Sequence, residues 1–322
     1  MTIFDSDHAP RAALVAGGRG FVGAQVARAL IGAGWRPTVF GPAMAQDRLA
    51  DLAGRYDEVA GSIEDRDALA RAFERARPEA VVSCVAHGVG ALGLMRSGEA
   101  QRDAAFAVNA LGHDRLLEAA GAAGVRRVVW TSSTVVYGPA SLYGGRRVDE
   151  DAATAPTTVY GLTKQLAEAI SAYHARRCGL DVVGLRLPLI LGPGLWYQGA
   201  ASALADLFAA ARANAPARVA FHDQPFDLMH VADVADAVLR ALDHRGPLDP
   251  VYNLKAVEAR LSEIVAEIAR RRPQARLAID VAAPALLFPL IDGARFSAAT
   301  GFHARHDLPR LVAALLEPGD AP

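Results

Sequence analysis

Tyr160 and Lys164, in the segment Y-G-L-T-K, stand four positions apart, which is the spacing of two side chains on one face of a helix. An ammonium beside a phenol favours the phenolate and lowers the pKa of the phenol from its ordinary value of about 10. A phenol tuned in this way can exchange a proton with an alcohol or a carbonyl oxygen beside a hydride transfer. The same spacing also occurs by chance on exposed helices, so the surrounding sequence decides what the pair does.

Hydroxyl side chains end an apolar run upstream of this pair. The run reads V-R-R-V-V-W-T-S-S-T over residues 125–134. Because ligands of a parallel sheet bind beside the carboxyl ends of its strands, these hydroxyls are predicted to lie at the ligand-binding edge. A serine there can hydrogen-bond the substrate oxygen that a neighbouring phenol protonates. Together with Tyr160 and Lys164, the run indicates proton and hydride exchange at a carbonyl or a secondary alcohol.

Gly17, Gly20 and Gly23 form a G-x-x-G-x-x-G pattern between an apolar run and a helical pattern. A tight turn of glycines lets backbone N–H groups approach a pyrophosphate, and the N-terminus of the following helix faces the negative charge. The alternative is a turn that serves only the close packing of a helix on a strand. In its strand–turn–helix context the pattern predicts a dinucleotide-binding site.

The second predicted strand ends in V-F-G-P, without the acidic residue that would hold the ribose hydroxyls of NAD, and the next acid is Asp47. Arg19, just before the second glycine of the pattern, is placed to meet a 2′-phosphate, and Arg48 is a more distant candidate. The alternative for both is a solvated arginine on the surface. The cofactor is therefore predicted to be NAD(P), with NADP slightly favoured over NAD.

Short apolar runs alternate with helical patterns along the first half of the chain. The predicted strands are 12–16, 38–40, 59–61, 80–86, 125–132 and 182–185, and the predicted helices are 21–32, 49–52, 67–75, 104–123 and 160–177. Continuous apolar runs indicate strands covered on both faces, and their alternation with helices indicates a parallel sheet. We predict an α/β fold, namely a Rossmann-like doubly wound parallel sheet with a smaller C-terminal substrate-binding subdomain.

The pattern becomes less regular in the second half of the chain. A loop rich in glycine and proline follows residue 189, and the later elements are helices at 204–213, 231–242, 261–272 and 308–316 and a short strand at 218–221. The Rossmann domain is expected to span 10–185, with 218–256 returning to it. The substrate-binding subdomain is expected to consist of 186–217 and 257–322.

Composition narrows the classes of protein and partner. The chain has 322 residues, of which 52% are hydrophobic and 21% are charged, as in a globular protein. A net charge of −1 gives no basic surface for nucleic acid, and two distant cysteines, Cys84 and Cys178, exclude a disulfide scaffold and a cysteine-based zinc site. The acidic N-terminus lacks a basic signal region, and prolines interrupt the longest uncharged stretch, 187–205. We expect a cytoplasmic enzyme with a small-molecule substrate, no metal, and neither nucleic acid nor membrane as partner.

Further motifs accompany the glycine pattern and the Tyr160–Lys164 pair. They are A-V-V-S-C-V-A at 80–86, Asn109, L-R-L-P-L-I-L-G-P-G at 185–194, H-V-A-D-V-A-D-A-V at 230–238, and V-Y-N-L at 251–254. With this set the chain resembles the extended short-chain dehydrogenases/reductases of the NAD-dependent epimerase/dehydratase family. The resemblance covers nearly the whole chain, and it is specific for the family but not for the substrate.

The resemblance implies a role for each matching residue. Ser133 matches the catalytic hydroxyl, Tyr160 the general acid and base, and Lys164 the residue that binds the nicotinamide ribose and tunes the tyrosine. The other implied cofactor contacts are Gly17, Gly20, Phe21, Val22 and Gly23 at the pyrophosphate, Ser62 and Ile63 at the adenine, and Val85, Ala86, His87, Asn109 and Pro188 beside the cofactor.

Some of these assignments have alternatives. Ser62 stands where the family commonly has aspartate, which weakens the expected adenine contact. Asn109 could instead bridge a helix and a strand, and His87 could be a loop histidine bonded to the backbone. The resemblance also implies a homodimer built by the helices at about 104–122 and 160–177.

Departures from the family pattern bear on the reaction. Thr134 and Val135 follow Ser133 where dehydratases have an aspartate and a glutamate, so loss of water is disfavoured. Leu189 stands where many nucleotide-sugar enzymes have an asparagine near the substrate diphosphate, which argues against a UDP-sugar. We favour a net dehydrogenase or reductase acting on a secondary alcohol or ketone of a sugar, sugar acid or similar polyol.

Two other hypotheses stay open. One is a nucleotide-sugar 4-epimerase with tightly bound NAD, which oxidises and re-reduces one carbon. The other is a non-catalytic NADP-binding sensor, which is disfavoured because such relatives usually lose the tyrosine and lysine that this chain keeps.

Overall fold

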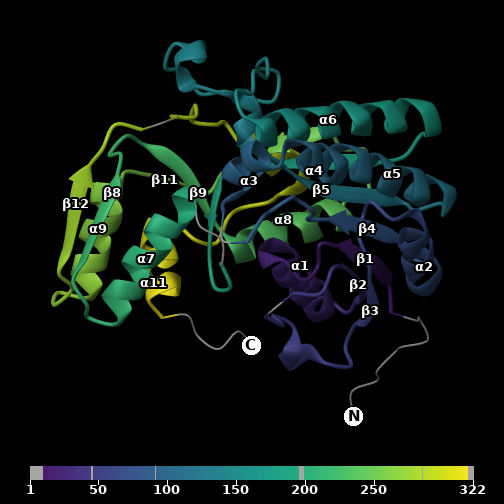
Figure 1. Cartoon of the computed structure of the whole chain (residues 1–322), viewed down its shortest axis with the longest axis horizontal. Coiled ribbons are helices and arrows are strands. Elements are labelled where there is room, and N and C mark those ends of the chain that lie inside the picture. The colour runs from purple at the N-terminus through teal and green to yellow at the C-terminus, as the bar shows by residue number, and fades with distance from the viewer. Residues whose placement is uncertain (1–9, 45, 91, 196–198, 285, 318–322) are drawn as a thin grey trace.

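The computed structural model describes residues 10–317 except 45, 91, 196–198 and 285. The chain forms a large lobe around a seven-stranded sheet and a small lobe beside it (Figure 1). In spatial order the strands of the large sheet are β10 (Val251–Asn253), β6 (Val182–Leu187), β5 (Arg127–Ser133), β4 (Ala80–Ser83), β1 (Ala12–Ala16), β2 (Arg36–Gly41) and β3 (Asp57–Ala60).

All neighbouring strands of the large sheet run parallel. The chain winds outward from β1 in one direction through β2 and β3, and then returns to β4 on the other side of β1. The carboxyl ends of β1 and β4 therefore flank the point where the winding changes direction, which is where such sheets bind ligands. The predicted α/β fold with a doubly wound parallel sheet is confirmed.

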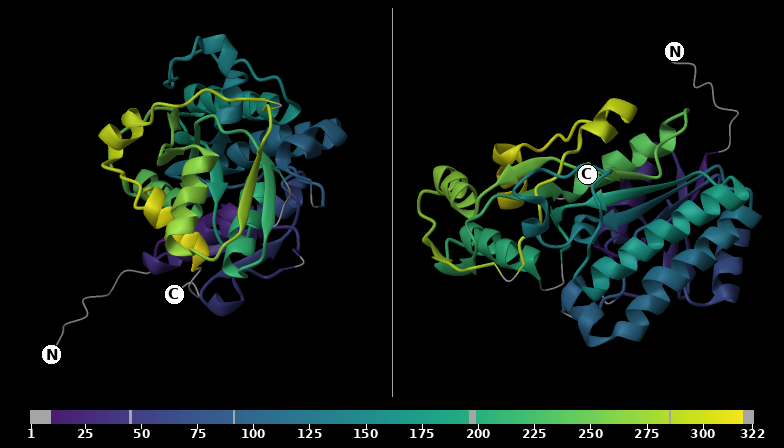
Figure 2. Two further views of the ribbon diagram at one scale, coloured as in Figure 1. Left: turned by 90° about the vertical axis from the view of Figure 1, so that its left-hand side faces the viewer. Right: turned by 90° about the horizontal axis from the view of Figure 1, so that it is seen from above.

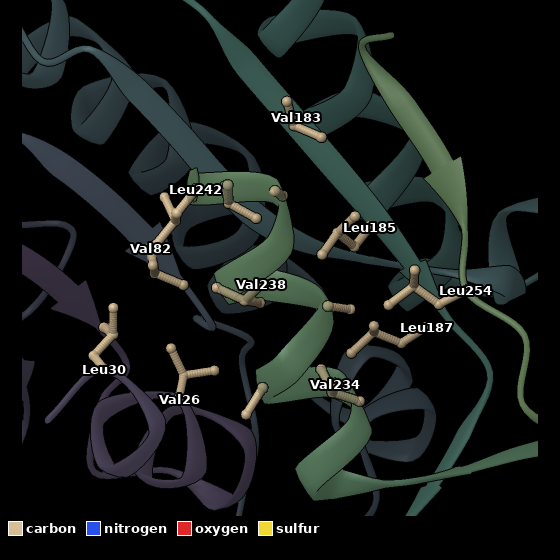
Figure 3. Close-up of a cluster of buried hydrophobic side chains, with 14 of the residues drawn as sticks. Val26, Leu30, Val82, Val183, Leu185, Leu187, Val234, Val238, Leu242 and Leu254 are labelled. Atoms are coloured by element: carbon tan, nitrogen blue, oxygen red, sulfur yellow. The ribbon is translucent and has the colours of Figure 1, made fainter. Parts of the chain in front are cut away.

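Two helices, α1 (Phe21–Gly32) and α8 (Val231–Asp243), cover one face of this sheet. Their apolar side chains meet those of the strands in a buried cluster (Figure 3). The cluster includes Val26, Leu30, Val82, Val183, Leu185, Val234, Val238 and Leu242. The alternate residues of the same strands point to the opposite face, so continuous apolar runs are buried on both sides, as the sequence predicted.

The opposite face carries α2 (Arg66–Ala76), α5 (Gly112–Ala122) and α6 (Val159–Cys178). Helix α3 (Leu94–Ala100) packs against α6, and α4 (Arg102–Phe106) continues through a π-helical turn, η2 (Ala107–Leu111), into α5. The single helix predicted at 104–123 is thus a helix with a π turn at its centre. Asn109 lies in that turn.

The small lobe has two small sheets of its own. One contains β11 (Val257–Ala259), β9 (Phe226–His230) and β7 (Leu189–Leu191), and the other pairs β12 (Leu277–Val281) with β8 (Ala217–Phe221). Helices α7 (Ala200–Arg212), α9 (Leu261–Arg271) and α11 (Leu308–Leu316) surround their apolar side chains. Figure 2 shows this lobe beside the large one, and α10 (Ala294–Thr300) packs on β10.

The lobes divide the chain differently from the sequence interpretation at one place. Within the range 218–256, α8 and β10 belong to the large lobe, but β8 pairs with β12 and β9 pairs with β7 and β11 in the small lobe. Only Val219 is buried in β8, and its neighbours Arg218 and Ala220 are exposed. A strand with one covered face suits a two-stranded sheet and not the interior of the large one. In the described part of the chain, no helix is both long and apolar enough to span a bilayer.

Candidate active site

The glycine pattern forms a tight turn between β1 and α1. The Gly17 N–H donates to the carbonyl of Phe40 at 2.8 Å, and the Gly20 N–H donates to the carbonyl of Gly17 at 3.0 Å. Gly17 has φ +73°, and a Cβ on it would lie 2.9 Å from the backbone of Cys84. The turn is therefore held against β2 on one side and β4 on the other, in a conformation that only glycine adopts readily.

The turn leads directly into the N-terminus of α1. Among the described residues no side chain caps this helix, and the backbone N–H of Ala24 bonds to the carbonyl of Gly20. A Cβ on Gly23 would run into the carbonyl of Gly17 and lie 2.8 Å from the Cα of Gly18. The close approach of helix and turn leaves a cradle with no side chains, in which an anion would face the positive end of the helix dipole.

Gly23→Ala is expected to weaken dinucleotide binding at least about tenfold and to destabilise the fold by about 1–3 kcal/mol, because the added methyl forces the turn apart. Nucleotide titration and chemical unfolding measure the two effects. Gly32→Ala is the matched control, since Gly32 ends the same helix and a Cβ there meets nothing within 4 Å. Equal binding by Gly23→Ala and the wild type would contradict the assignment of the turn.

Tyr160 lies in the first turn of α6. The Thr158 side chain caps this helix by accepting from the Gly161 N–H, and Glu99 of α3 accepts from the Val159 N–H at 2.8 Å. A Cβ on Gly98 would lie 3.1 Å from the backbone nitrogen of Tyr160, so α3 packs directly on the start of α6. Tyr160 is buried, with 7% of its surface exposed. Its position is fixed by backbone contacts from a second helix.

Lys164 lies one turn further along α6 and is also buried. Its ammonium donates to the carbonyl of Thr131 on β5 at 2.8 Å and to the carbonyl of Val85, just after β4, at 3.2 Å. Burial lowers the pKa of Lys164 to about 8, while Cys84 and the charge of Glu168 act in the opposite direction. The amine therefore still carries its proton at neutral pH. It joins α6 to the carboxyl ends of two central strands.

Ser133 is the last residue of β5, two positions beyond the carbonyl that Lys164 holds. It is buried, and its hydroxyl accepts from the Val135 N–H. Ser133 thereby caps the short 3-10 helix η3 (Thr134–Tyr137). Ser133 pairs in register with Leu187 of β6, which directly precedes Pro188. The structure thus brings Ser133, Lys164 and Pro188 to one edge of the sheet.

The side-chain amide of Asn109 has two partners. Its oxygen accepts from the His87 N–H at 2.7 Å, and its nitrogen donates to the Thr163 hydroxyl at 2.9 Å. The Thr163 hydroxyl in turn donates to the carbonyl of Tyr160 at 2.8 Å. Asn109 therefore bridges the loop after β4 and helix α6. The buried Nε2 atom of His87 has no hydrogen-bond partner within the described structure.

The remaining predicted cofactor residues lie along the same edge. Phe21 is buried, and Val22 and Ala86 are half-buried. The Ser62 hydroxyl donates to Glu64 at 3.1 Å, and Ile63 packs against Gly112 at the start of α5.

The two arginine candidates for a 2′-phosphate differ in their partners. Arg19 forms an ion pair with Glu58 of β3, which compensates its charge. Arg48 donates from Nε to the carbonyl of Gly194 at 3.1 Å and from Nη2 to Gln46, and burial lowers its pKa. Its buried Nη1 atom has no partner in the described part of the chain. Arg48 is thus the better placed of the two to meet an added anion.

A pair next to this site was not predicted. Glu168 accepts from both Nε and Nη2 of Arg186 at 2.8 Å, and from the Ser132 hydroxyl at 2.7 Å. The available signal was the spacing on α6, because Glu168 stands four residues after Lys164 and therefore shares its helix face. No group of three or more metal-ligating side chains occurs among the residues the structure describes.

The polar side chains of the motif at 230–238 bind a helix end and a segment before α11. The ring of His230 caps α8 by accepting from the Ala232 N–H, and Asp233 accepts from the backbone of Arg305 and from the ring and backbone of His306. Arg295 forms ion pairs with Glu150 and Asp151, away from the residues named above. The contacts of Asp233 join α8 to the segment that leads into α11 of the small lobe.

Known proteins resemble this chain in sequence and in fold. Residues 13–254 match the NAD-dependent epimerase/dehydratase family. The UDP-glucose 4-epimerase of Rhizobium leguminosarum bv. trifolii is 29% identical over 248 residues, which cover 72% of each chain. The L-arabinose 1-dehydrogenase (NAD(P)(+)) of Haloferax volcanii is 31% identical over 145 residues, which cover 42% of this chain and 53% of that one.

Among solved structures, a GalE-like L-threonine dehydrogenase from Cupriavidus necator superposes with a TM-score of 0.81 at 24% identity, covering 96% of this chain and 99% of that one. The UDP-glucose 4-epimerase of Thermotoga maritima gives a TM-score of 0.82 at 21% identity, covering 95% and 97%. These two likenesses establish the fold, and the sequence match establishes the family. The chain therefore belongs to the NAD-dependent epimerase/dehydratase family, and it is an enzyme of the extended short-chain dehydrogenase/reductase type.

Proposed function

We propose that this enzyme is an NAD(P)-dependent dehydrogenase or reductase that interconverts a secondary alcohol and a ketone in a sugar, sugar acid or similar polyol. The observation that carries the proposal is the double hydrogen bond of Lys164, whose ammonium binds the carbonyls of Thr131 and Val85. That contact sets the helix of Tyr160 against the strand that ends in Ser133 and the strand that touches the glycine turn.

A nicotinamide dinucleotide fits the residues present. The turn at Gly17, Gly20 and Gly23 has no side chains where a pyrophosphate would lie, and α1 directs its positive end there. Lys164 is the donor for the nicotinamide ribose, and Val85, Ala86, His87, Asn109 and Pro188 belong to the same edge. When bound, the nicotinamide supplies or accepts a hydride.

The side chains of this protein handle the proton and the substrate oxygen. In the reducing direction the Tyr160 hydroxyl donates its proton to the oxygen of the carbonyl, and in the oxidising direction the phenolate accepts it back. The Ser133 hydroxyl hydrogen-bonds the same oxygen and fixes its position. The Lys164 ammonium lowers the pKa of the phenol, so that proton exchange proceeds near neutral pH.

A 4-epimerase acting on a nucleotide sugar is the second candidate, because the relative from Rhizobium leguminosarum is a UDP-glucose 4-epimerase. The apolar Leu189 weighs against it. This residue begins β7 directly after Pro188 and packs against the apolar core of the small lobe, where it offers no donor to a diphosphate.

The two candidates differ in whether the cofactor leaves after each turnover. Denaturing freshly purified protein and identifying the released nucleotide by mass spectrometry tests this difference. We expect protein that is largely empty and that turns over secondary alcohols or ketones with added cofactor. Near-stoichiometric NAD would instead favour the epimerase and overturn the preference for NADP.

We also propose that Arg48 contacts the 2′-phosphate of NADP. Arg48→Gln is expected to weaken NADPH binding about tenfold and to change NADH binding less than about twofold, because one charge-assisted hydrogen bond is lost. Fluorescence titration with the two nucleotides measures both. Arg19→Gln is the control, since Glu58 already compensates that charge. An equal loss for NADPH and NADH in Arg48→Gln would refute the assignment.

The helices η2, α5 and α6 are proposed to form a homodimer interface. Three apolar side chains on these helices are exposed, namely Leu111 at 55%, Tyr173 at 47% and Leu166 at 37%. Leu166→Asp is expected to shift the dimer to monomer in sedimentation experiments, because it puts a charge in an apolar contact. Leu142→Asp is the control, since Leu142 is also exposed, at 59%, but lies on the separate 3-10 helix η4 (Ala140–Tyr143). A wild-type monomer at micromolar concentration would rule this interface out.

The proposed setting is the cytoplasm, with a small molecule as the partner. Cys84 and Cys178 are both free thiols, which suits a reducing compartment. The net charge of −1 supports a role without nucleic acid.

A further inference from the structure

Glu168 joins the three elements on which the candidate site is built. It lies on α6, one turn beyond Lys164 and two turns beyond Tyr160. Its carboxylate accepts from the Ser132 hydroxyl on β5 and, through both oxygens, from Arg186 on β6. Ser132 immediately precedes Ser133. One carboxylate thus connects the helix of the phenol to the strand of the serine.

The pair of Glu168 and Arg186 is buried. Their side chains are 11% and 5% exposed, and both nitrogens that face Glu168 bind at 2.8 Å. The third guanidinium nitrogen, Nη1, donates to the Tyr137 hydroxyl at 2.7 Å. Tyr137 continues the network to the side chain of Asn253 at 2.8 Å. Such a bidentate, hydrogen-bonded pair fixes the orientation of both partners.

The charged and titratable groups around Lys164 belong to several elements. On its own helix Glu168 is negative and Tyr160 is a phenol, whose ring centroid lies 5.8 Å from the Lys164 nitrogen. On α5, burial lowers the pKa of His113 to about 3. Directly after β4, burial raises the pKa of Cys84 to about 12, so both groups are neutral. The ring of Trp130 on β5 lies 5.5 Å away and carries no charge.

Glu168 is the carboxylate that acts on both buried cations of this region. Lys164 on α6 and Arg186 on β6 are cations. Glu168 binds Arg186 directly, and it stands four residues after Lys164 on α6, where its negative charge favours the ammonium. A guanidinium does not release its proton under ordinary conditions, whereas a buried ammonium does. Removing the negative charge of Glu168 would therefore lower the pKa of Lys164 further.

We propose that Glu168 is a positioning residue for the reaction, which holds Ser133 and Tyr160 at a fixed spacing and keeps Lys164 in its ammonium form. The proposal rests on the proposed function, because the ammonium matters through the phenol of Tyr160. It assigns to the Glu168–Arg186 pair a task beyond stability, since a buried ion pair alone contributes little net stability over apolar residues of the same size.

Glu168→Gln tests the charge while keeping the side-chain size. We expect Lys164 to lose its proton at a lower pH, so that the phenolate of Tyr160 forms at higher pH, by about one unit or more. The ultraviolet absorbance of phenolate, measured as the difference between each protein and its Tyr160→Phe counterpart, reports this transition without turnover. In the oxidising direction, the acid limb of kcat should shift upward by a similar amount.

Two further variants separate charge from structure. Glu150→Gln removes another buried carboxylate, which accepts from the Asn253 N–H at the far end of the same network and lies outside α6. It should leave the phenolate transition where the wild type has it. The double variant Glu168→Gln/Arg186→Gln removes both charges, restores the charge balance at Lys164, and should bring the transition back toward that of the wild type.

Each outcome bears on the proposal. A phenolate transition in folded Glu168→Gln that matches the wild type, or a double variant that stays with the single one, overturns it. A shifted transition with rescue by the double variant supports it, even if no alcohol or ketone is turned over, in which case the proposed function fails alone. Turnover that depends on Tyr160 together with an unshifted transition keeps the function and refutes the role of Glu168.

Discussion

Replacing Tyr160 with phenylalanine is expected to lower kcat by about three orders of magnitude and to leave cofactor affinity within a factor of about two. The phenol is the group in reach of Lys164 that can pass a proton to a substrate oxygen, and phenylalanine keeps the ring but loses that proton. Steady-state kinetics on a ketone or alcohol substrate and nucleotide titration measure the two quantities.

The substitution is expected to leave the fold intact. The backbone at Tyr160 is held by the packing of α3 on the start of α6 and by the Thr158 cap, and both remain. Tyr173→Phe is the matched control, because Tyr173 lies on the same helix with 47% of its surface exposed. Full kcat in Tyr160→Phe would show that another group moves the proton, and the mechanism would have to be reassigned.

Replacing Lys164 with methionine is expected to affect both binding and rate. The ribose donor and the charge that tunes Tyr160 disappear together, so we expect cofactor affinity to fall about tenfold and kcat to fall about a hundredfold. Titration with nucleotide and a pH profile of kcat measure these effects. In the oxidising direction, activity near neutral pH should be lost first, because without the ammonium the phenol keeps its proton to higher pH.

The second of the two lysines in the chain, Lys255, provides a control for Lys164→Met. Lys255 lies in the small lobe, where its ammonium pairs with Glu258 and lies 3.6 Å from Asp227. Lys255→Met is therefore expected to change the stability of that lobe and to leave the affinity for nucleotide unchanged. Unchanged cofactor affinity in Lys164→Met would contradict its place at the ribose.

Local sequence was enough to predict six of the seven strands of the large sheet, all but the short edge strand β10. The run A-A-L-V-A of β1 and the run of β5 are buried on both faces, and the sequence marks such strands by continuous apolar residues. Strand β9 was missed, because its sequence F-D-L-M-H contains Asp227. That carboxylate is buried in the fold, where it accepts from the Ile291 N–H. A partner 64 residues away is invisible to a local pattern.

Some residues of the candidate site could be predicted from local sequence, and others could not. Tyr160, Lys164 and the glycine turn are set by spacing along one helix or one loop, so the sequence predicts them. Glu168 and Arg186 meet only when α6 packs on β6, and the ion pair of Arg19 with Glu58 forms only when β3 joins the sheet edge. The spacing on α6 marks the helix face of Glu168, but the partner of each acidic residue cannot be read along the chain.

The most direct test of the central claim is an equilibrium titration of nucleotide-free protein with NADPH and NADH, followed by nicotinamide fluorescence, in the wild type and in Gly23→Ala. We predict that the wild type binds both nucleotides with saturation and binds NADPH more tightly, and that Gly23→Ala loses most of this affinity. A folded wild-type protein that binds neither nucleotide would contradict the claim that the glycine turn and the Tyr160–Lys164 helix form a dinucleotide site.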